Sequence, residues 1–119
     1  MIKTQNTKRF DLEDRTLAFA RSVIGYTKTS AKTISNVEVI KQLIRSSGSV
    51  GANYIEANES LSKRDFLMRI KICRKEAKET RYWLNLLDAT EDPVRGKLIQ
   101  ESTELMKIFG SIITRSNRF

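Results

Sequence analysis

A run of basic side chains in the segment 61–90 offers the clearest chemistry in this sequence. The segment carries eight basic and four acidic residues. At 100° per residue along a helix, five of the basic residues gather into one stripe over several turns: Arg64, Lys71, Arg74, Lys75 and Lys78. Spaced cations of this kind contact the phosphates of a nucleic acid without reading its bases. The stripe therefore predicts a backbone-binding site for RNA or DNA.

The same stripe has a second interpretation, as a solvated helix face held by ion pairs between residues four apart. Lys75 and Glu79 have that spacing. Lys71 and Lys75, however, form a like-charge pair, from which a purely structural face gains nothing. Both interpretations of the stripe stay open at the level of the sequence.

The charge of the whole chain is typical of a protein that binds polyanions. Lys and Arg number 22 against 14 Asp and Glu, which gives a net charge of +8 at pH 7. Residues 1–10 contribute three basic side chains, Lys3, Lys8 and Arg9, and no acidic ones. A basic excess gathered on one element is the electrostatic footprint of nucleic-acid binding. We expect residues 1–10 to form a basic N-terminal arm, and a second candidate contact site, ahead of a single domain over 11–119.

The sequence lacks the residues of several common catalytic centres. It contains no histidine, which excludes Ser-His-Asp and Cys-His catalysis and every His-containing zinc or di-iron site. Cys73 is the single cysteine, so neither an intrachain disulfide nor a four-cysteine metal site can form. We expect Cys73 to be a small buried thiol. We expect the protein not to be an enzyme and to carry no metal or cofactor.

Three carboxylates, Glu56, Glu76 and Glu79, could meet inside a helical bundle as a metal site. Di-metal sites of that kind ordinarily use Glu-x-x-His pairs, and no His is present. We therefore expect a structural role for these carboxylates, as partners of arginines on neighbouring helices: Arg45, Arg69 or Arg81. Tyr82 and Trp83 are expected in the core or in an interface rather than as platforms for base stacking.

No targeting or membrane segment is evident in the sequence. Residues 1–10 lack the apolar stretch of a secretory signal, and no run approaches about 18 consecutive apolar residues. Together with the single free thiol, these features predict a cytoplasmic protein.

The elements that carry these residues are predicted from apolar periodicity. Helical spacing of apolar residues recurs in four segments, near 11–28, 36–58, 63–90 and 93–116. The expected helix starts are Asn36 or Ser35, Ser62, and the pair Asp92–Pro93. With 5 Gly and 1 Pro, the chain has too few turn residues for a β-sandwich. The prediction is an all-α, antiparallel up-down-up-down four-helix bundle.

Each predicted helix has a seam that should face the core. In the second helix a spacing of alternately four and three residues passes through 46–52, a poor helix-forming segment. We expect one continuous helix there; two helices joined by a Gly-rich turn are the alternative. The seams are Phe10, Leu17, Ala20 and Ile24; then Ile40, Ile44, Ser47, Gly51, Tyr54 and Asn58; then Phe66, Ile70, Cys73, Ala77, Thr80, Leu84 and Leu87; then Val94, Leu98, Ser102, Leu105, Phe109 and Ile112.

Further apolar residues lie off these seams and suggest a subunit interface. One bundle core needs one apolar stripe per helix, whereas the first and second helices carry two. The surplus residues form the candidate oligomer interface: Leu12, Phe19, Tyr26, Val39, Leu43, Val50 and Ala57. Single exposed apolar residues are normal on protein surfaces, but two coherent extra stripes favour a homo-oligomer.

Several stretches of the sequence resemble a known family. Ser49-Val-Gly-Ala-Asn-Tyr54 is followed by Glu56-Ala57 and Ser62-Lys-Arg-Asp-Phe66, and later by Glu76-Ala-Lys-Glu-Thr-Arg-Tyr-Trp-Leu84 and Leu86-Leu87. A small-residue helix with a Tyr-Trp-Leu run at this separation resembles the signature of the four-helix-bundle protein family, also called 23S rRNA-intervening-sequence or S23-type ribosomal proteins. The resemblance covers the second and third helices closely. It departs at Asn58-Glu59, where many members have a Gly-containing turn.

The resemblance implies an antiparallel four-helix bundle that usually assembles as a ring-shaped homopentamer. Members are encoded within intervening sequences of bacterial large-subunit rRNA genes, or free-standing in bacterial genomes. A related branch is the accessory protein of diversity-generating retroelements, which binds nucleic acid and the reverse transcriptase. The resemblance brings no catalytic residues. Two functions stay open: a non-catalytic, basic, oligomeric protein that binds RNA or DNA, and a protein-interaction scaffold that binds an acidic protein partner.

Overall fold

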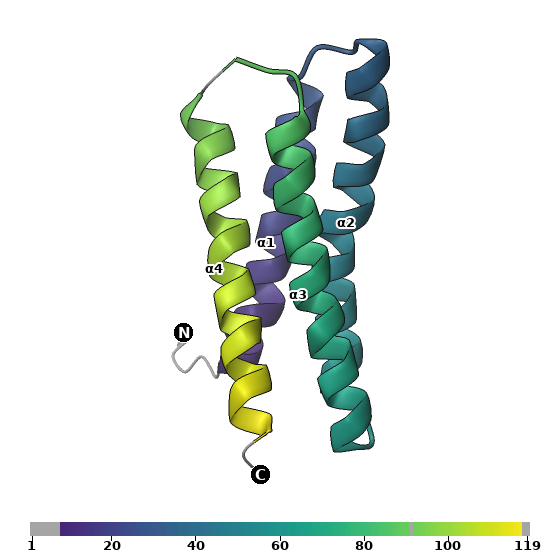
Figure 1. Ribbon diagram of the computed structural model, residues 1–119, viewed down its shortest axis with the longest axis vertical. Helices are drawn as coiled ribbons and strands as arrows, with labels where there is room; N and C mark the ends of the chain where they lie inside the picture. Colours follow the sequence, from purple (N-terminus) through teal and green to yellow (C-terminus); the bar gives the residue numbers. More distant parts are fainter. Residues whose placement is uncertain (1–7, 91, 118–119) are drawn as a thin grey trace, which may run out of the picture.

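Four helices run antiparallel in a computed structural model that describes residues 8–90 and 92–117, with side chains from residue 12 onward (Figure 1). They are α1 (Lys8–Lys28), α2 (Ile34–Asn58), α3 (Lys63–Leu86) and α4 (Pro93–Ser116). The described residues contain no strand. Short connections make each helix reverse the direction of the one before it. The predicted all-α, up-down-up-down four-helix bundle is confirmed.

Each helix packs mainly against its neighbours in sequence. The contacts between α2 and α3 and between α3 and α4 are extensive, those between α1 and α2 are intermediate, and α1 and α4 share few. The pair α1–α2 and the pair α3–α4 therefore form opposite sides of the bundle. All four helices contribute to the core, which includes Phe19, Leu43, Leu84 and Phe109.

The helix starts follow the expected capping chemistry with one correction. The Ser62 hydroxyl accepts a hydrogen bond from Asp65 N at 3.1 Å, and the Asp92 carboxylate accepts one from Arg95 N at 2.8 Å. The start of α2 differs, because Thr33 is its N-cap and accepts from Asn36 N at 3.1 Å. Capping by Asn36 or Ser35 was therefore a wrong prediction.

Two helix ends also differ from the expected ones. The helix α1 begins at Lys8, so Lys8 and Arg9 belong to its first turn, whereas Lys3 lies outside the described residues. The helix α3 ends at Leu86 rather than near residue 90. Asn36 explains the earlier end: its buried side chain bonds to both backbone polar groups of Asp88 and holds that residue outside the helix.

The small-residue segment of α2 is helical throughout, which confirms the continuous helix. Gly51 faces α1 so closely that a Cβ there would come within 2.8 Å of Thr16 Oγ1. Gly48, by contrast, has nothing within 4 Å of the position of a Cβ. Of these two glycines, only Gly51 therefore lies at a close approach of the neighbouring helix.

The seven residues expected at a subunit interface pack against other residues of their own chain instead. Six of them are buried in its own core: Leu12, Phe19, Val39, Leu43, Val50 and Ala57. The seventh, Tyr26, is partly buried and donates a hydrogen bond to Asp92 Oδ2 at 3.0 Å. This prediction of an interface is wrong, because the stripe assigned to a partner is the core-facing stripe of α1 and α2. Conversely, Leu17 and Ile44 from the expected seams are 51% and 44% exposed.

Buried threonines explain why the core face of α1 was misassigned. The side chains of Thr16 and Thr27 are buried on the core-facing side of α1. The Thr16 hydroxyl donates to the Leu12 carbonyl at 2.7 Å, and the Thr27 hydroxyl donates to the Ile24 carbonyl at 2.7 Å. Because each hydroxyl is satisfied within its own helix, burial leaves no unpaired donor. A stripe that looks half polar in the sequence is therefore fully core-facing.

Candidate nucleic-acid interface

The five candidate residues of α3 are all exposed, as the helical wheel predicts: Arg64, Lys71, Arg74, Lys75 and Lys78. The buried seam of α3 runs through Ile70, Cys73, Ala77, Thr80 and Leu84. That seam confirms the core face predicted for α3, and it turns the stripe of cations outward. The Ser62 N-cap and the packing of α3 between α2 and α4 fix the orientation of the helix.

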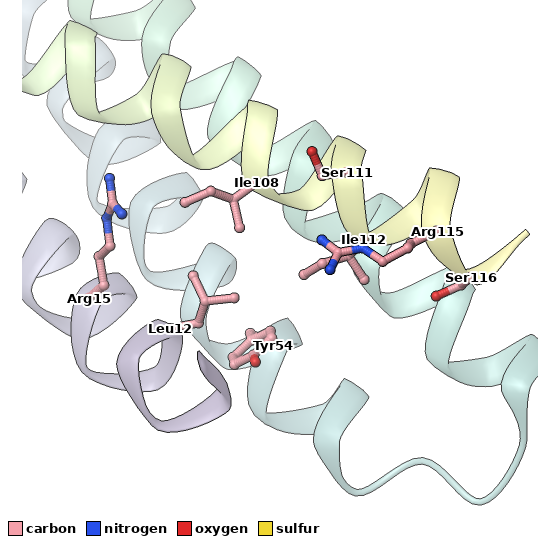
Figure 2. A pocket seen from close by; sticks show the side chains of 8 residues that line it. All are labelled: Leu12, Arg15, Tyr54, Ile108, Ser111, Ile112, Arg115 and Ser116. Atoms are coloured by element: carbon pink, nitrogen blue, oxygen red, sulfur yellow. The ribbon is translucent and has the colours of Figure 1, made fainter. Parts of the chain in front are cut away.

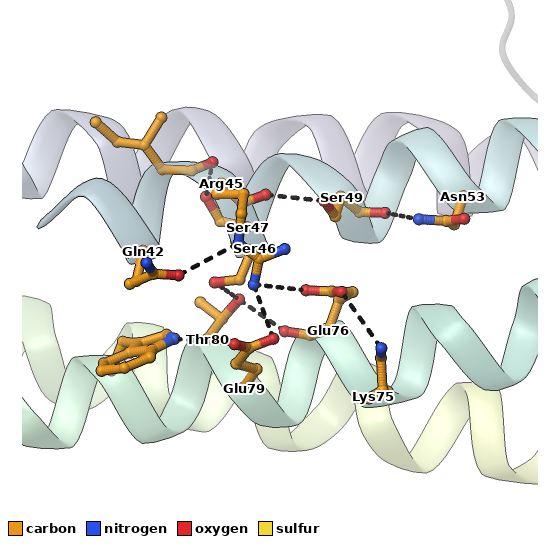
Figure 3. Close-up of polar contacts among 12 residues, drawn as sticks. Gln42, Arg45, Ser46, Ser47, Ser49, Asn53, Lys75, Glu76, Glu79 and Thr80 are labelled. Atoms are coloured by element: carbon orange, nitrogen blue, oxygen red, sulfur yellow. Dashed lines mark hydrogen bonds and ion pairs between the residues drawn. The ribbon is translucent and has the colours of Figure 1, made fainter. Parts of the chain in front are cut away.

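On the α2 side of α3, one arginine pairs with two carboxylates (Figure 3). Arg45 Nη2 lies 2.8 Å from Glu79 Oε1 and 3.4 Å from Glu76 Oε1. The Glu76 side chain is 8% exposed, so a buried negative charge is compensated across the α2–α3 contact. This confirms the structural role expected for these two carboxylates. Glu56 is exposed and lies apart from them.

The network also shifts the acidity of Glu79. Partial burial pushes the pKa of the Glu79 carboxyl upward, but hydrogen bonds from Arg45 and Trp83 outweigh burial and leave that pKa below its usual value. The bond to Glu79 in turn raises the pKa of Arg45. Since Glu79 is engaged with Arg45, it does not form the ion pair with Lys75 that its i,i+4 spacing predicts. Lys75 Nζ lies instead 3.9 Å from Glu76 Oε2.

Polar side chains also join α3 to α2 and to α4, and they include the two arginines of α3 that lie outside the stripe. The Thr80 hydroxyl lies 2.8 Å from both Ser46 Oγ and the Glu76 carbonyl (Figure 3). Arg69 donates to Asn53 Oδ1 at 2.8 Å, and Arg81 donates to Thr103 Oγ1 at 3.1 Å. Arg69 and Arg81 thus join helices together through neutral partners and not, as one alternative had it, through carboxylates.

The cations of the stripe stand in contrast to this network. Among residues 12–90 and 92–117, Arg64, Lys71, Arg74 and Lys78 form no ion pair. Lys75 has only its long contact with Glu76. The stripe is therefore a surface of largely uncompensated positive charge, unlike the ion-paired helix face that was the alternative interpretation.

Two cations of α4 adjoin this stripe and were missed in the sequence. A hollow of about 630 Å³ on the outer side of the α3–α4 contact is lined by Arg74, Lys107, Gly110, Ser111, Thr114 and Arg115. Arg74 Nη1 lies 3.9 Å from where a Cβ on Gly110 would be. We call the surface formed by the five α3 cations with Lys107 and Arg115 the basic face. The pairing of α3 with α4 brings these residues together, and the periodicity of either helix alone gives no sign of it.

A second hollow lies on the other side of Arg115, between α1, α2 and α4 (Figure 2). Its volume is about 530 Å³, and its lining is mostly apolar, with Leu12, Tyr54, Ile108 and Ile112. The few contacts between α1 and α4 leave this space open. Arg15 at its rim is held by Glu101 through hydrogen bonds of 2.7 and 2.9 Å. This hollow contains no pair of residues that resembles a nucleophile and its base.

Cys73 is fully buried in the seam of α3, as predicted. Burial raises the pKa of its thiol to about 12, so the thiol is protonated at neutral pH. In the described part of the chain, no three or more Cys, Asp or Glu side chains are grouped so that they could hold a metal ion. Trp83 is half-buried and donates to Glu79 Oε2 at 3.4 Å, whereas its neighbour Tyr82 is exposed.

Within the described residues, no helix combines the length and the apolar character that a membrane span requires.

The fold and the charged surface define a basic, antiparallel four-helix-bundle protein. A model of the 23S rRNA-intervening sequence protein family matches residues 8–111, and the chain belongs to that family. It is similar to a solved structure described as a protein with unknown function from the S23 ribosomal protein family of Bacteroides thetaiotaomicron VPI-5482. The two are 32% identical with a TM-score of 0.79, over 91% of this chain and 99% of the other. No curated protein matches the chain.

Proposed function

We propose that this protein binds RNA or DNA without catalysing a reaction, through contacts between its basic face and backbone phosphates. The observation that carries the proposal is the row of five exposed α3 cations: among the described residues four have no carboxylate partner, and Lys75 has only its 3.9 Å contact with Glu76. Like charges one helical turn apart repel one another. A polyanion relieves that repulsion and releases its own counterions in exchange.

The position of the carboxylates supports the same conclusion. Glu76 and Glu79 lie one and four residues beyond Lys75, yet each has an oxygen paired with Arg45 of α2, and only the second oxygen of Glu76 contacts the stripe, 3.9 Å from Lys75 Nζ. These two carboxylates therefore act mainly in the α2–α3 contact and leave the stripe largely uncompensated. Phosphate contacts of this kind position a protein on a backbone and carry little base information, so binding should depend weakly on sequence.

Charge reversal on the basic face tests this proposal. Lys71→Glu combined with Lys78→Glu should weaken binding to a structured RNA, and to a duplex DNA of the same length, by about tenfold or more. RNA is the first probe because the family name refers to 23S rRNA. Arg21→Glu combined with Lys41→Glu is the matched control, because it makes the same change of net charge with exposed residues of α1 and α2. An equal loss of affinity in both variants would show that binding depends on net charge alone and not on the basic face.

Absence of nucleic-acid binding at low salt would reject the proposal. That result would favour the second function, a scaffold that presents the basic face to an acidic protein. The cytoplasm is the compartment that we expect for either function.

We also propose that the chain forms a homo-oligomer, through the outer side of the α1–α2 pair. Ile44 and Ile55 lie within about 40° of Gly51 around α2, and Gly51 touches Thr16, the neighbour of Leu17. Leu17, Ile44 and Ile55 are 44–52% exposed and so flank the α1–α2 contact with apolar surface. We propose that a second copy of the chain packs against this outer side of the α1–α2 pair. That side is opposite the basic face, so the contact between subunits leaves the basic face of every subunit free.

Light scattering tests the assembly. A homo-oligomer at about 10 µM is the expected state, and five subunits is the number that the family resemblance implies. Ile44→Glu with Ile55→Glu should yield folded monomers, because burying two carboxylates in a subunit contact is costly. Monomeric wild-type protein would contradict the assembly, although it would leave the proposal for the basic face intact.

A further inference from the structure

We propose that the hollow between α3 and α4 is a binding site for a phosphomonoester, the terminal phosphate of a nucleic-acid strand. The source of the phosphate rests on the proposed function; the chemistry of the site does not. The hollow is lined by three cations from two helices, Arg74, Lys107 and Arg115, and by two hydroxyls, Ser111 and Thr114. The α3 stripe, in contrast, spaces its cations along one helix axis.

The balance of charge in the hollow matches a dianion. Lys107 Nζ lies 3.7 Å from Glu104 Oε2, so one of the three cations is compensated. Arg74 and Arg115 have no ion pair with any other residue that the structure describes. About two positive charges therefore remain in excess. A phosphate monoester carries about −1.5 to −2 at pH 7, whereas each phosphodiester in the strand carries a single negative charge.

The donors that line the hollow also suit a terminal phosphate. A guanidinium presents paired N–H donors that match two phosphate oxygens at once. The Ser111 and Thr114 hydroxyls have no hydrogen bond to another described residue and add two short donors. A monoester offers three strongly accepting oxygens to these groups, one more than an internal diester leaves free of ester bonds.

The position of Gly110 keeps the site open. Arg74 reaches across to α4, and its Nη1 would be 3.9 Å from a Cβ on Gly110. A long side chain at residue 110 would occupy the space beside this guanidinium. The hollow is open to solvent, and its volume of about 630 Å³ falls within the size range of small-molecule sites. Thr114 and Arg115 lie beyond the residues that match the family model, and the site is proposed for this chain.

The test compares three single-stranded 12-nucleotide RNAs of one sequence, with a 5′-phosphate, a 3′-phosphate or hydroxyl groups at both ends. Fluorescence anisotropy at about 0.1 M salt should show that one or both phosphorylated RNAs bind about five- to tenfold more tightly than the hydroxyl form. Arg115→Gln and Arg74→Gln should abolish this preference. Lys75→Gln, which removes an exposed cation outside the hollow, should retain it.

Equal affinity for all three RNAs would overturn the inference and leave the proposed function standing. If none of the three RNAs binds, the proposed function is judged by the structured RNA and duplex DNA at low salt, and inorganic phosphate tests the hollow alone. Phosphate that shifts the amide NMR signals of Gly110 and Thr114 in the wild type but not in Arg115→Gln would support a phosphomonoester site with a different source. No such shift would overturn the site as well.

Discussion

Gly51 of α2 and Thr16 of α1 meet so closely that a methyl group on Gly51 would lie 2.8 Å from Thr16 Oγ1 and 3.2 Å from its Cβ. Thr16 cannot yield easily, because its hydroxyl is held by the Leu12 carbonyl at 2.7 Å and the residue is buried. The contact sets the spacing of the α1–α2 pair. A glycine at position 51 therefore allows α1 to pack closely, although glycine has a low helix propensity.

Gly51→Ala should destabilise the protein by about 1–3 kcal/mol, because the added methyl overpacks a rigid contact. Gly48→Ala is the matched control, since a Cβ there meets nothing within 4 Å. The control should stabilise the protein by up to about 1 kcal/mol through helix propensity. Urea unfolding followed by circular dichroism measures both changes. If both substitutions raised the unfolding free energy by the same amount, the close approach at Gly51 would be contradicted.

Asn36 joins the loops at one end of the bundle. Its side-chain amide donates to the carbonyls of Ala31 and Asp88 at 3.1 and 2.9 Å, and its oxygen accepts from Asp88 N at 3.0 Å. Asn36→Ala should cost about 2–3 kcal/mol of unfolding free energy, because it leaves backbone groups without partners.

Asn85→Ala is the control for Asn36, since Asn85 is exposed and bonds to its own helix at Arg81 O. Its effect should stay within about 0.5 kcal/mol. The two variants are compared by thermal and urea unfolding. A loss for Asn36→Ala no larger than that of the control would show that water replaces the Asn36 bonds at no cost.

Arg45 pairs with both Glu76 and Glu79, and its removal leaves the Glu76 carboxylate buried beside α2 without this partner. Arg45→Met should therefore destabilise the protein by about 2 kcal/mol. Adding Glu76→Gln should recover part of that loss, because the unpaired charge is removed. Lys41→Met is the control for an exposed pair, with Glu38 at 3.4 Å, and should change stability by less than about 0.5 kcal/mol.

The same network predicts the direction of a pH effect. The pKa of Glu79 is lowered from its usual 4.5, since the bonds from Arg45 and Trp83 outweigh partial burial. A lowered carboxyl pKa contributes stability above the unfolded value, and that contribution is lost as the pH falls through the folded value. The difference in unfolding free energy between wild type and Arg45→Met should thus shrink between about pH 5 and pH 3. A difference that grows on acidification would contradict the network.

Cys73 should be unreactive in the folded protein. Burial raises the pKa of its thiol to about 12, and the thiolate is the reactive species. N-ethylmaleimide at about pH 8 should label Cys73 only after unfolding. Lys41→Cys in a Cys73→Ser background supplies an exposed cysteine as the control for reagent activity. Rapid labelling of the native wild type would show that the α3 seam opens.

The α3 helix shows how far the sequence can predict this structure. Its seam is mostly apolar, with Thr80 as a single threonine among residues such as Ile70 and Leu84, so one helix suffices to define both the core and the opposite stripe of cations. The core face of α1 could not be predicted in the same way. The buried hydroxyls of Thr16 and Thr27 are satisfied by carbonyls one turn earlier, and that satisfaction is invisible in a pattern of residue types.

The basic face likewise has a part that the sequence predicts and a part that it does not. The α3 cations follow from the periodicity of one helix, whereas Lys107 and Arg115 join them through the register of α3 against α4. In that register Arg81 donates to Thr103 and Arg74 lies beside Gly110. Such contacts between distant segments cannot be deduced from the periodicity of either helix.

The dependence of RNA affinity on salt tests the central claim most directly. For wild type, log affinity should fall linearly with log salt, with a slope that reflects the number of phosphates contacted. Lys71→Gln with Lys78→Gln should reduce the steepness of that slope by about 2, one for each lost phosphate contact. Arg21→Gln with Lys41→Gln, on α1 and α2, should leave it unchanged. A wild-type affinity that does not change with salt, or an equal change of slope in both variants, would contradict phosphate binding by the basic face.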